Sequence, residues 1–126
     1  GQIAELLGPK WLGGPLRRGP LILCGDFNAP AVSKAYRRLA SRFRDVQTLL
    51  RDHRPRRTWS SRCPVARIDH IFVSDDLEVA HIEVPRTELA VRASDHLPLI
   101  ADLILPAVPP DEAAAPAPVS RQSVVP

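Results

Sequence analysis

The strongest constraint on the fold is a short apolar run, Leu21 to Cys24, which lies between Pro20 and Gly25. A run of this length without polar residues is typical of a β-strand buried on both faces, in a sheet covered by other layers. Apolar residues also dominate 68–74, which predicts a second buried strand, and 97–105, which predicts a last apolar strand. Because strands alternate with helical patterns early in the chain, we expect an α+β domain whose sheet packs against helices.

The remaining elements follow from periodicity and capping residues. Apolar residues at helical spacing predict a helix over 2–7, and Ser33 is suited to cap a helix that continues to Ala40. A strand is predicted over 77–84, where apolar and polar residues alternate. The segment 45–50 fits either a short helix or an extended stretch.

The end of the chain differs in composition from the rest. Residues 106–126 are rich in Pro, Ala and Ser and lack periodicity, which predicts a disordered tail behind a folded part formed by residues 1–105. No stretch of about 18 apolar residues occurs, so no membrane span is predicted. Two cysteines are too few for a disulfide framework, which favours reduced thiols and a cytoplasmic protein.

Positive charge is unevenly distributed within a net charge of +3. Six arginines lie in one predicted loop: Arg51, Arg54, Arg56, Arg57, Arg62 and Arg67. A cationic rim attracts phosphates or nucleic acid by long-range steering, whereas the plainer interpretation is a solvated loop. Base stacking would need interleaved aromatic residues, and Trp59 stands alone there, which weakens the hypothesis of a dedicated nucleic-acid-binding domain.

The first motif that carries chemistry is Gly25-Asp26-Phe27-Asn28, directly after the first strand. Gly25 is expected to turn the chain and to present Asp26 and Asn28 at the end of the sheet, where ligand sites of open α/β structures gather. A carboxylate there holds a metal or orients a water, and an amide N–H donates to a phosphate oxygen. Because Asp and Asn are also common turn formers, the motif alone favours a plain turn.

The second motif is Arg67-Ile68-Asp69-His70-Ile71-Phe72-Val73-Ser74, in which Asp69 interrupts an apolar strand. A buried carboxylate is costly without a partner. One interpretation is a salt bridge to an arginine such as Arg67. The other is a carboxylate that orients a histidine, fixes its tautomer and stabilises its charged form.

The third motif, Ser94-Asp95-His96-Leu97-Pro98, precedes the last strand. Asp95 and His96 at a strand entry bring a carboxylate and an imidazole into one cleft. Taken alone, such a histidine is more often an ordinary surface residue. The combination is far more specific, because all three motifs lie within a strand or at its boundary.

Together these motifs resemble those of the endonuclease/exonuclease/phosphatase family, which includes abasic-site endonucleases, DNase I-like nucleases, inositol-phosphate phosphatases and sphingomyelinases. The resemblance extends over about 2–105, and Thr58-Trp59-Ser60-Ser61 is similar to small bacterial members. It implies a DNase I-like α/β sandwich, in which two sheets are flanked by helices. Because the motifs resemble those of the carboxyl-terminal half, about half of that sandwich is expected.

The resemblance also implies roles for the motif residues. Asp26 orients or deprotonates the attacking water, or helps to hold a metal, and Asn28 contacts the scissile phosphate. Asp95 serves the metal site. His96 binds the phosphate and stabilises the charge of the transition state, and Asp69 pairs with His96. The implied metal is Mg²⁺ or Mn²⁺, which suits carboxylate ligands.

Two departures from the family pattern bear on these roles. His70 stands where many relatives have Tyr, and we interpret it as a structural variant. The first half of the family domain supplies an Asn and the main metal-binding Glu. Glu5 is no substitute, because by the resemblance it lies in a helix between the halves. The amino-terminal half of the domain is therefore expected to be missing.

The sequence thus predicts metal-dependent hydrolysis of phosphoester bonds, by a phosphodiesterase, nuclease or phosphatase, as part of a larger domain. The alternative is a catalytically inactive fragment, or a module that binds phosphate or nucleic acid and lacks the metal-binding Glu. Expected partners are a phosphate-ester substrate, such as nucleic acid or a phospholipid headgroup, and the missing half-domain. By itself the chain is expected to be a poor catalyst and an unstable monomer. The apolar residues expected to face water are Ile22, Ile71, Val73 and Leu99.

Overall fold

The computed structural model describes residues 2–14 and 19–107. Their elements, in chain order, are α1 (Gln2–Leu6), β1 (Ile22–Asp26), α2 (Lys34–Ala40), β2 (Arg44–Asp45), the 3-10 helix η1 (Val46–Thr48), β3 (Asp69–Val73), β4 (Glu78–Glu83), α3 (Glu88–Ala93) and β5 (Ile100–Ile104). The predicted tail lies outside the described residues from position 108 onward.

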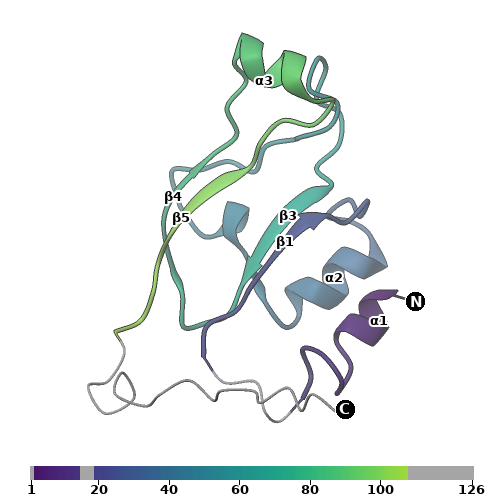
Figure 1. Cartoon of the computed structure of the whole chain (residues 1–126), viewed down its shortest axis with the longest axis vertical. Coiled ribbons are helices and arrows are strands. Elements are labelled where there is room, and N and C mark those ends of the chain that lie inside the picture. Colours follow the sequence, from purple (N-terminus) through teal and green to yellow (C-terminus); the bar gives the residue numbers. More distant parts are fainter. Residues whose placement is uncertain (1, 15–18, 108–126) are drawn as a thin grey trace, which may run out of the picture.

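Strand β3 lies at the centre of a layered arrangement (Figure 1). In the first sheet it pairs antiparallel with β1 on one side and β2 on the other, while β4 and β5 form a second antiparallel sheet. One core cluster joins β3 to the helical side, and its buried members are Leu7, Leu39, Phe43 and Phe72. A second cluster joins β3 to η1 and β4, and its buried members are Val46, Val73, Leu77 and Ile82. Consecutive residues of β3 therefore enter different cores, as the alternation of a strand requires.

Most elements predicted from the sequence are confirmed. The predicted cap is present, since the hydroxyl of Ser33 accepts a hydrogen bond from the backbone N–H of Tyr36 at 3.1 Å. The ambiguous segment 45–50 contains both alternatives, because an extended pair of residues leads directly into η1. The last strand begins only at Ile100, so Pro98 precedes it and removes no ladder hydrogen bond.

The burial predicted for β1 on both faces is wrong, because Cys24 is exposed and Ile22 is 50% exposed. The expectation that Ile22 faces water in this chain is thereby confirmed. The expectation that Val73 faces water is also wrong, because it is fully buried in the second core. An apolar run predicts that a strand has at least one buried face, but it does not show whether another layer covers each of the two faces.

The helix α3 was not predicted. It is only six residues long, which is too short for its apolar residues to show a helical period in the sequence, and none of them is buried. Its signal is a cap: the hydroxyl of Thr87 accepts from the backbone N–H of Ala90 at 3.1 Å. In Figure 1 this helix projects beyond one end of the sheets. None of the helices formed by the described residues has the length and apolar character needed to cross a membrane.

Candidate active site

Strand pairing brings Asp26 and Asp69 together. Asp26 ends β1, Asp69 begins β3, and the antiparallel register places the two residues directly opposite each other. Directly opposed residues of an antiparallel pair project to the same face, so both carboxylates lie on one side of the sheet. The first two motifs therefore meet through the sheet itself.

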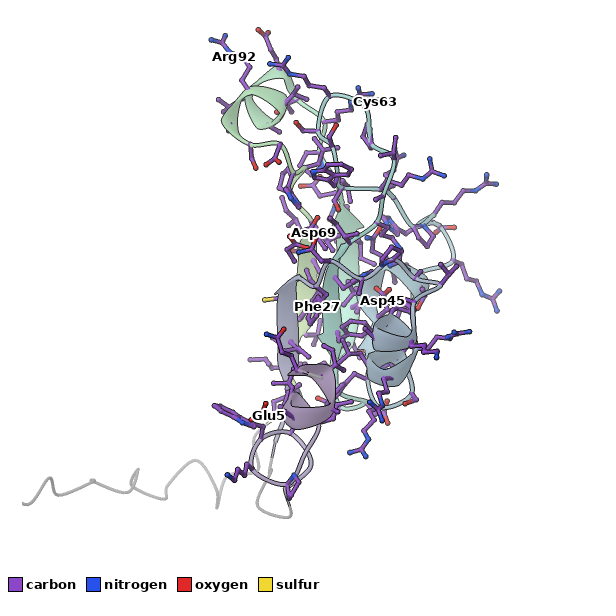
Figure 2. All side chains as sticks on the ribbon, turned by 90° about the vertical axis from the view of Figure 1, so that its right-hand side faces the viewer. Glu5, Phe27, Asp45, Cys63, Asp69 and Arg92 are labelled. Carbon is purple, nitrogen blue, oxygen red and sulfur yellow. The ribbon has the colours of Figure 1, made fainter. Side chains whose placement is uncertain are left out.

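His96 reaches this place from the segment before β5. It forms an isolated antiparallel bridge with Trp59, and the next backbone N–H, of Leu97, donates to the carbonyl of Thr58 at 2.8 Å. The imidazole is thereby set against Asp69, with Nδ1 2.9 Å from Oδ2 and 3.1 Å from Oδ1. Figure 2 shows Asp69 at the end of the first sheet nearer to α3, with Phe27 of the first motif below it.

The contact with Asp69 sets the charge and orientation of His96. With its hydrogen on Nδ1, the ring donates to the carboxylate and leaves Nε2 facing outward, 4.0 Å from Oδ2 of Asp26. The hydrogen bond to Asp69 raises the pKa of His96, against a smaller opposing effect of burial. The side chain remains 26% exposed. The site thus holds a readily protonated imidazole with one free edge next to a second carboxylate.

Thr58 positions the carboxylate of Asp69, which in turn positions His96. The sequence analysis assigned no role to Thr58. Its side chain is fully buried, and its hydroxyl donates to Oδ2 of Asp69. Donors on two sides fix the plane of the Asp69 carboxylate. The only sequence signal was the similarity of the stretch 58–61 to small bacterial family members.

The first motif forms its turn later than predicted. Gly25 lies within β1 with φ of 153°, a backbone conformation that favours glycine, and the chain turns at Asn28, which has φ of 47°. The backbone N–H of Asn28 donates to Oδ1 of Asp26 at 2.8 Å, which closes the turn typical of Asp and Asn residues. Asp26 and Asn28 are both exposed and belong to one rigid turn beside His96.

His70 supports this turn from below. It is 1% exposed, and its Nε2 lies 2.7 Å from the carbonyl of Ala29, so that nitrogen carries the hydrogen and donates. Its ring lies among three aromatic neighbours, Tyr36, Phe27 and Phe72. Burial lowers the pKa of His70, which keeps the ring neutral in its core position. A structural role for His70 agrees with these contacts.

Arg67 serves the core and not Asp69. Its Nη1 lies 2.5 Å from Oδ2 of Asp45, and its guanidinium covers the ring of Tyr36 at 5.2 Å. The carboxylate of Asp45 is almost fully buried, with 2% of its side chain exposed. The interpretation that paired Asp69 with Arg67 is therefore wrong, because Arg67 is already engaged by a more deeply buried carboxylate.

Asp95 lies at the edge of the site. Its backbone carbonyl accepts from the N–H of Ser61 at 2.7 Å, while the residue itself is exposed. Among the described residues, one group of side chains offers metal-ligand atoms within 4.8 Å of one another, and it consists of Asp26, Asp69 and His96. Asp95 is close enough to help raise the pKa of His96 but is not a member of that group.

A two-sheet fold with opposed aspartates at a strand end and an Asp–His pair beside them is the arrangement expected of part of a DNase I-like α/β sandwich. The chain belongs to the endonuclease/exonuclease/phosphatase family, whose model matches residues 2–96. No curated protein matches the chain.

Solved structures agree with the fold. An endonuclease/exonuclease/phosphatase from Bacteroides vulgatus is 24% identical with a TM-score of 0.63, and the match covers 83% of this chain and 42% of that one. A mannosyl-6-phosphatase from Bacteroides thetaiotaomicron VPI-5482 is 25% identical with a TM-score of 0.62, and the match covers 82% of this chain and 43% of that one. A functionally unknown conserved protein from Enterococcus faecalis V583 is 24% identical with a TM-score of 0.62, and the match covers 83% of this chain and 42% of that one. The chain thus spans about 42% of these proteins, and the predicted partial DNase I-like domain is confirmed.

Proposed function

We propose that this chain supplies one part of the active site of a metal-dependent phosphoester hydrolase. The observation that supports it best is the pair formed by Asp69 and His96, with Asp26 only 4.0 Å from the free edge of the imidazole. A phosphate oxygen at that edge would accept from a charged imidazole. The carboxylate of Asp26 is at the same time placed to act on a water.

Each residue then has a chemical task during attack of water on phosphorus. His96 donates from Nε2 to a phosphate oxygen and stabilises the negative charge that grows there. Asp69 keeps the imidazole charged and correctly turned, and Thr58 keeps Asp69 in place. Asp26 orients the attacking water and accepts its proton. The amide of Asn28, held by the same turn, donates to the phosphate.

The donor set fits a hard divalent cation. Mg²⁺ in proteins usually takes one or two carboxylates and keeps several waters. Among the described residues no hydrogen bond engages Oδ2 of Asp26, so this atom is available as a ligand, whereas Asp69 is occupied by Thr58 and His96. In its alternative role, Asp26 would help to hold the ion through Oδ2 in place of accepting the proton of the water, with Asp95 beside it and further ligands from the rest of the family domain. Bound there, Mg²⁺ or Mn²⁺ would neutralise phosphate charge and activate water.

The test is an assay of the complete domain that contains this chain, with chromogenic phosphomonoester and phosphodiester substrates. Hydrolysis is expected with Mg²⁺ or Mn²⁺ and should be abolished by EDTA, then restored by excess metal. Activity that survives exhaustive chelation would contradict the metal-dependent reaction. The name of the mannosyl-6-phosphatase neighbour makes a phosphomonoester a sensible first substrate.

A second candidate is a phosphate-binding module without turnover. It is favoured by the ligand groups of the site, because among the described residues two carboxylates and one histidine gather there and Asp69 is already engaged by Thr58 and His96. The same assay on this chain alone distinguishes the two. Binding of phosphate without hydrolysis, and no gain when the rest of the domain is added, would support the binding module.

A further inference from the structure

The turn that carries Asn28 is held from the core by one side chain. Among the described residues, His70 is the one side chain from outside the turn that donates to its backbone, and its Nε2 lies 2.7 Å from the carbonyl oxygen of Ala29. The hydrogen bond between Asn28 and Asp26 lies within the turn and is exposed to water. Because water competes for an exposed hydrogen bond, the buried contact constrains the position of the turn more strongly.

This turn needs such a constraint because its backbone is unusual. Asn28 has φ of 47°, a left-handed conformation that few residues other than glycine adopt. Ala29 follows directly and is 3% exposed, so water does not readily replace a lost partner of its carbonyl. Without the donor on His70, that carbonyl would regain a partner by turning toward water, and Asn28 would move with it.

A buried cation fixes the hydrogen of His70 on the nitrogen that faces the turn. The Nδ1 of His70 lies 3.5 Å from Nη1 of Arg67, which can only donate, so Nδ1 accepts and carries no hydrogen. Arg67 is itself held by Asp45, whose carboxylate is almost fully buried. The ring of Tyr36 encloses the imidazole on one side, with 4.9 Å between the two ring centroids. A side chain that only filled the core would not need its hydrogen on one particular nitrogen.

Strand β3 places this histidine and the site in a fixed relation. In the antiparallel register, Asp69 lies opposite Asp26. Successive residues of a strand project to opposite faces, so Asp69 holds His96 on one face of β3, while His70 holds the turn from the helical face. One strand therefore sets the distance between the imidazole of His96 and the amide of Asn28.

We propose that His70 is a positioning residue for the phosphate contacts of the site, because its hydrogen bond fixes Asn28 where the amide can contact the same phosphate as His96. This inference rests on the proposed function, since it concerns the phosphate contacts of that site. His70 is buried in the core, so its effect on turnover passes through the turn.

Two variants of similar size separate the hydrogen bond from the packing. His70→Gln keeps an N–H donor near the position of Nε2 and an oxygen that can accept from Arg67, whereas His70→Met has an unbranched side chain of the same length and no donor. In the complete domain, His70→Met should lower kcat/KM for a chromogenic phosphoester by about 10- to 100-fold, the scale of a misplacement of up to about 1 Å. His70→Gln should retain most of the rate. Equal losses in the two variants would overturn the proposal, because packing alone would then explain them.

The matched control is a change in the same core that removes no hydrogen-bond partner of the turn. Leu39→Ala removes a fully buried side chain from the core cluster on the helical side. It should lower the melting temperature at least as much as His70→Met and leave kcat/KM unchanged, when rates are measured well below both melting transitions. Equal losses of kcat/KM in Leu39→Ala and His70→Met would overturn the proposal, since any weakening of this core would then slow the reaction.

A double-mutant cycle tests whether the effect passes through Asn28. Asn28→Gly permits the left-handed backbone and removes the side-chain amide. On that background, His70→Met should lower kcat/KM far less than it does in the parent domain, since the two changes affect one contact. Additive losses would show that His70 does not act through Asn28.

A measurement that needs no turnover keeps this inference apart from the proposed function. By NMR relaxation, the backbone N–H of Asn28 should have an order parameter of about 0.85 in the parent domain and in His70→Gln, and below about 0.6 in His70→Met. A turn that stays rigid in His70→Met would overturn the proposal, whether or not the domain is a hydrolase. A domain that hydrolyses no phosphoester, with the turn loosened as expected, would refute the hydrolase and leave the positioning of the turn by His70 standing.

Discussion

Two histidines near the start of β3 occupy contrasting surroundings. His70 belongs to a buried network with Asp45, Arg67 and Tyr36, whereas His96 belongs to an open group with Asp26 and Asp69. Burial lowers the pKa of His70, and the hydrogen bond with Asp69 raises that of His96. Both rings have a carboxylate nearby, so the presence of an acid does not decide the outcome.

Burial is the largest cause of the lowered pKa of His70, and the other contacts of each carboxylate add to the difference between the two rings. Asp45 is neutralised by Arg67 at 2.5 Å and lies 3.8 Å from the ring of His70, so its pull on a proton is offset by the adjacent guanidinium. Asp69 is held by the neutral hydroxyl of Thr58, so its charge acts fully on His96. A cation in the first network favours stability, and its absence from the second favours a reactive imidazole.

The largest effect is expected from breaking the buried network. Arg67→Met leaves the buried carboxylate of Asp45 without its cation, and the free energy of unfolding should fall by about 3–5 kcal/mol. Denaturant unfolding measures the change. The matched control is Asp75→Asn, which breaks the ion pair between Arg44 and Asp75. Because the side chain of Asp75 is 94% exposed, the free energy of unfolding should fall by less than about 1 kcal/mol. Similar losses in the two variants would show that the network is not a buried ionic core.

The open group should matter for turnover and little for stability. In the complete domain, His96→Ala and Asp26→Asn are each expected to lower kcat by roughly two orders of magnitude, the scale of losing a transition-state donor or a base. Steady-state kinetics with the best chromogenic substrate provide the measurement. His81→Ala, on an exposed histidine of β4, serves as the control and should leave kcat unchanged. A near-normal rate in His96→Ala would remove His96 from the mechanism.

A smaller effect is expected at the residue that joins the site to the core. Thr58→Val keeps the volume but removes the donor to Asp69, so kcat should fall about 10-fold through a less well oriented imidazole. This is below the roughly 100-fold or greater contribution of a direct general acid or base, because Thr58 acts only through Asp69. Thr58→Ser restores a hydroxyl and should recover most of the rate. If Ser and Val behave alike, packing and not the hydrogen bond explains the importance of Thr58.

The smallest effect is a difference in titration, observed by NMR of the two imidazoles. His96 should remain protonated above the ordinary pKa of about 6.5, and His70 should stay neutral below it. His96 therefore contributes stability that is present below pH 6.5 and is lost as pH rises through its raised pKa. His70 contributes stability that is present above pH 6.5 and is lost as pH falls through its lowered pKa. Two coincident titration curves would contradict the comparison.

The sequence indicated where chemistry would occur because strand boundaries are local features. Asp26 follows an apolar run and Asp69 interrupts another, and antiparallel pairing then brings them together. The sequence left the partner of Asp69 open between Arg67 and a histidine. That choice depends on contacts between distant segments, since Thr58 and His96 lie 11 and 27 residues away from Asp69. A local sequence pattern does not show which residues so far apart in the chain come into contact.

Other parts of the fold were harder to predict for a different reason. The burial of Val73, which was expected to face water, depends on which layers lie over β3, and an apolar side chain looks the same in sequence whether it is covered or not. The turn at Asn28 was assigned to Gly25, because glycine is the usual residue for unusual backbone angles. Gly25 does use its freedom, with φ of 153°, but it does so inside the strand, and Asn28 takes the left-handed conformation of the turn, which its side chain tolerates.

The adjacency of Asp69 and His70 has a consequence for how this protein tolerates change. One residue serves the cleft and the next serves the core, so deleting a single residue within β3 would send the carboxylate into an aromatic interior and the core imidazole into the cleft. Substitutions in this strand alter one environment at a time, whereas a change of length alters both at once. Mutational libraries of this protein should therefore vary 69–73 in place and keep the length of the strand constant.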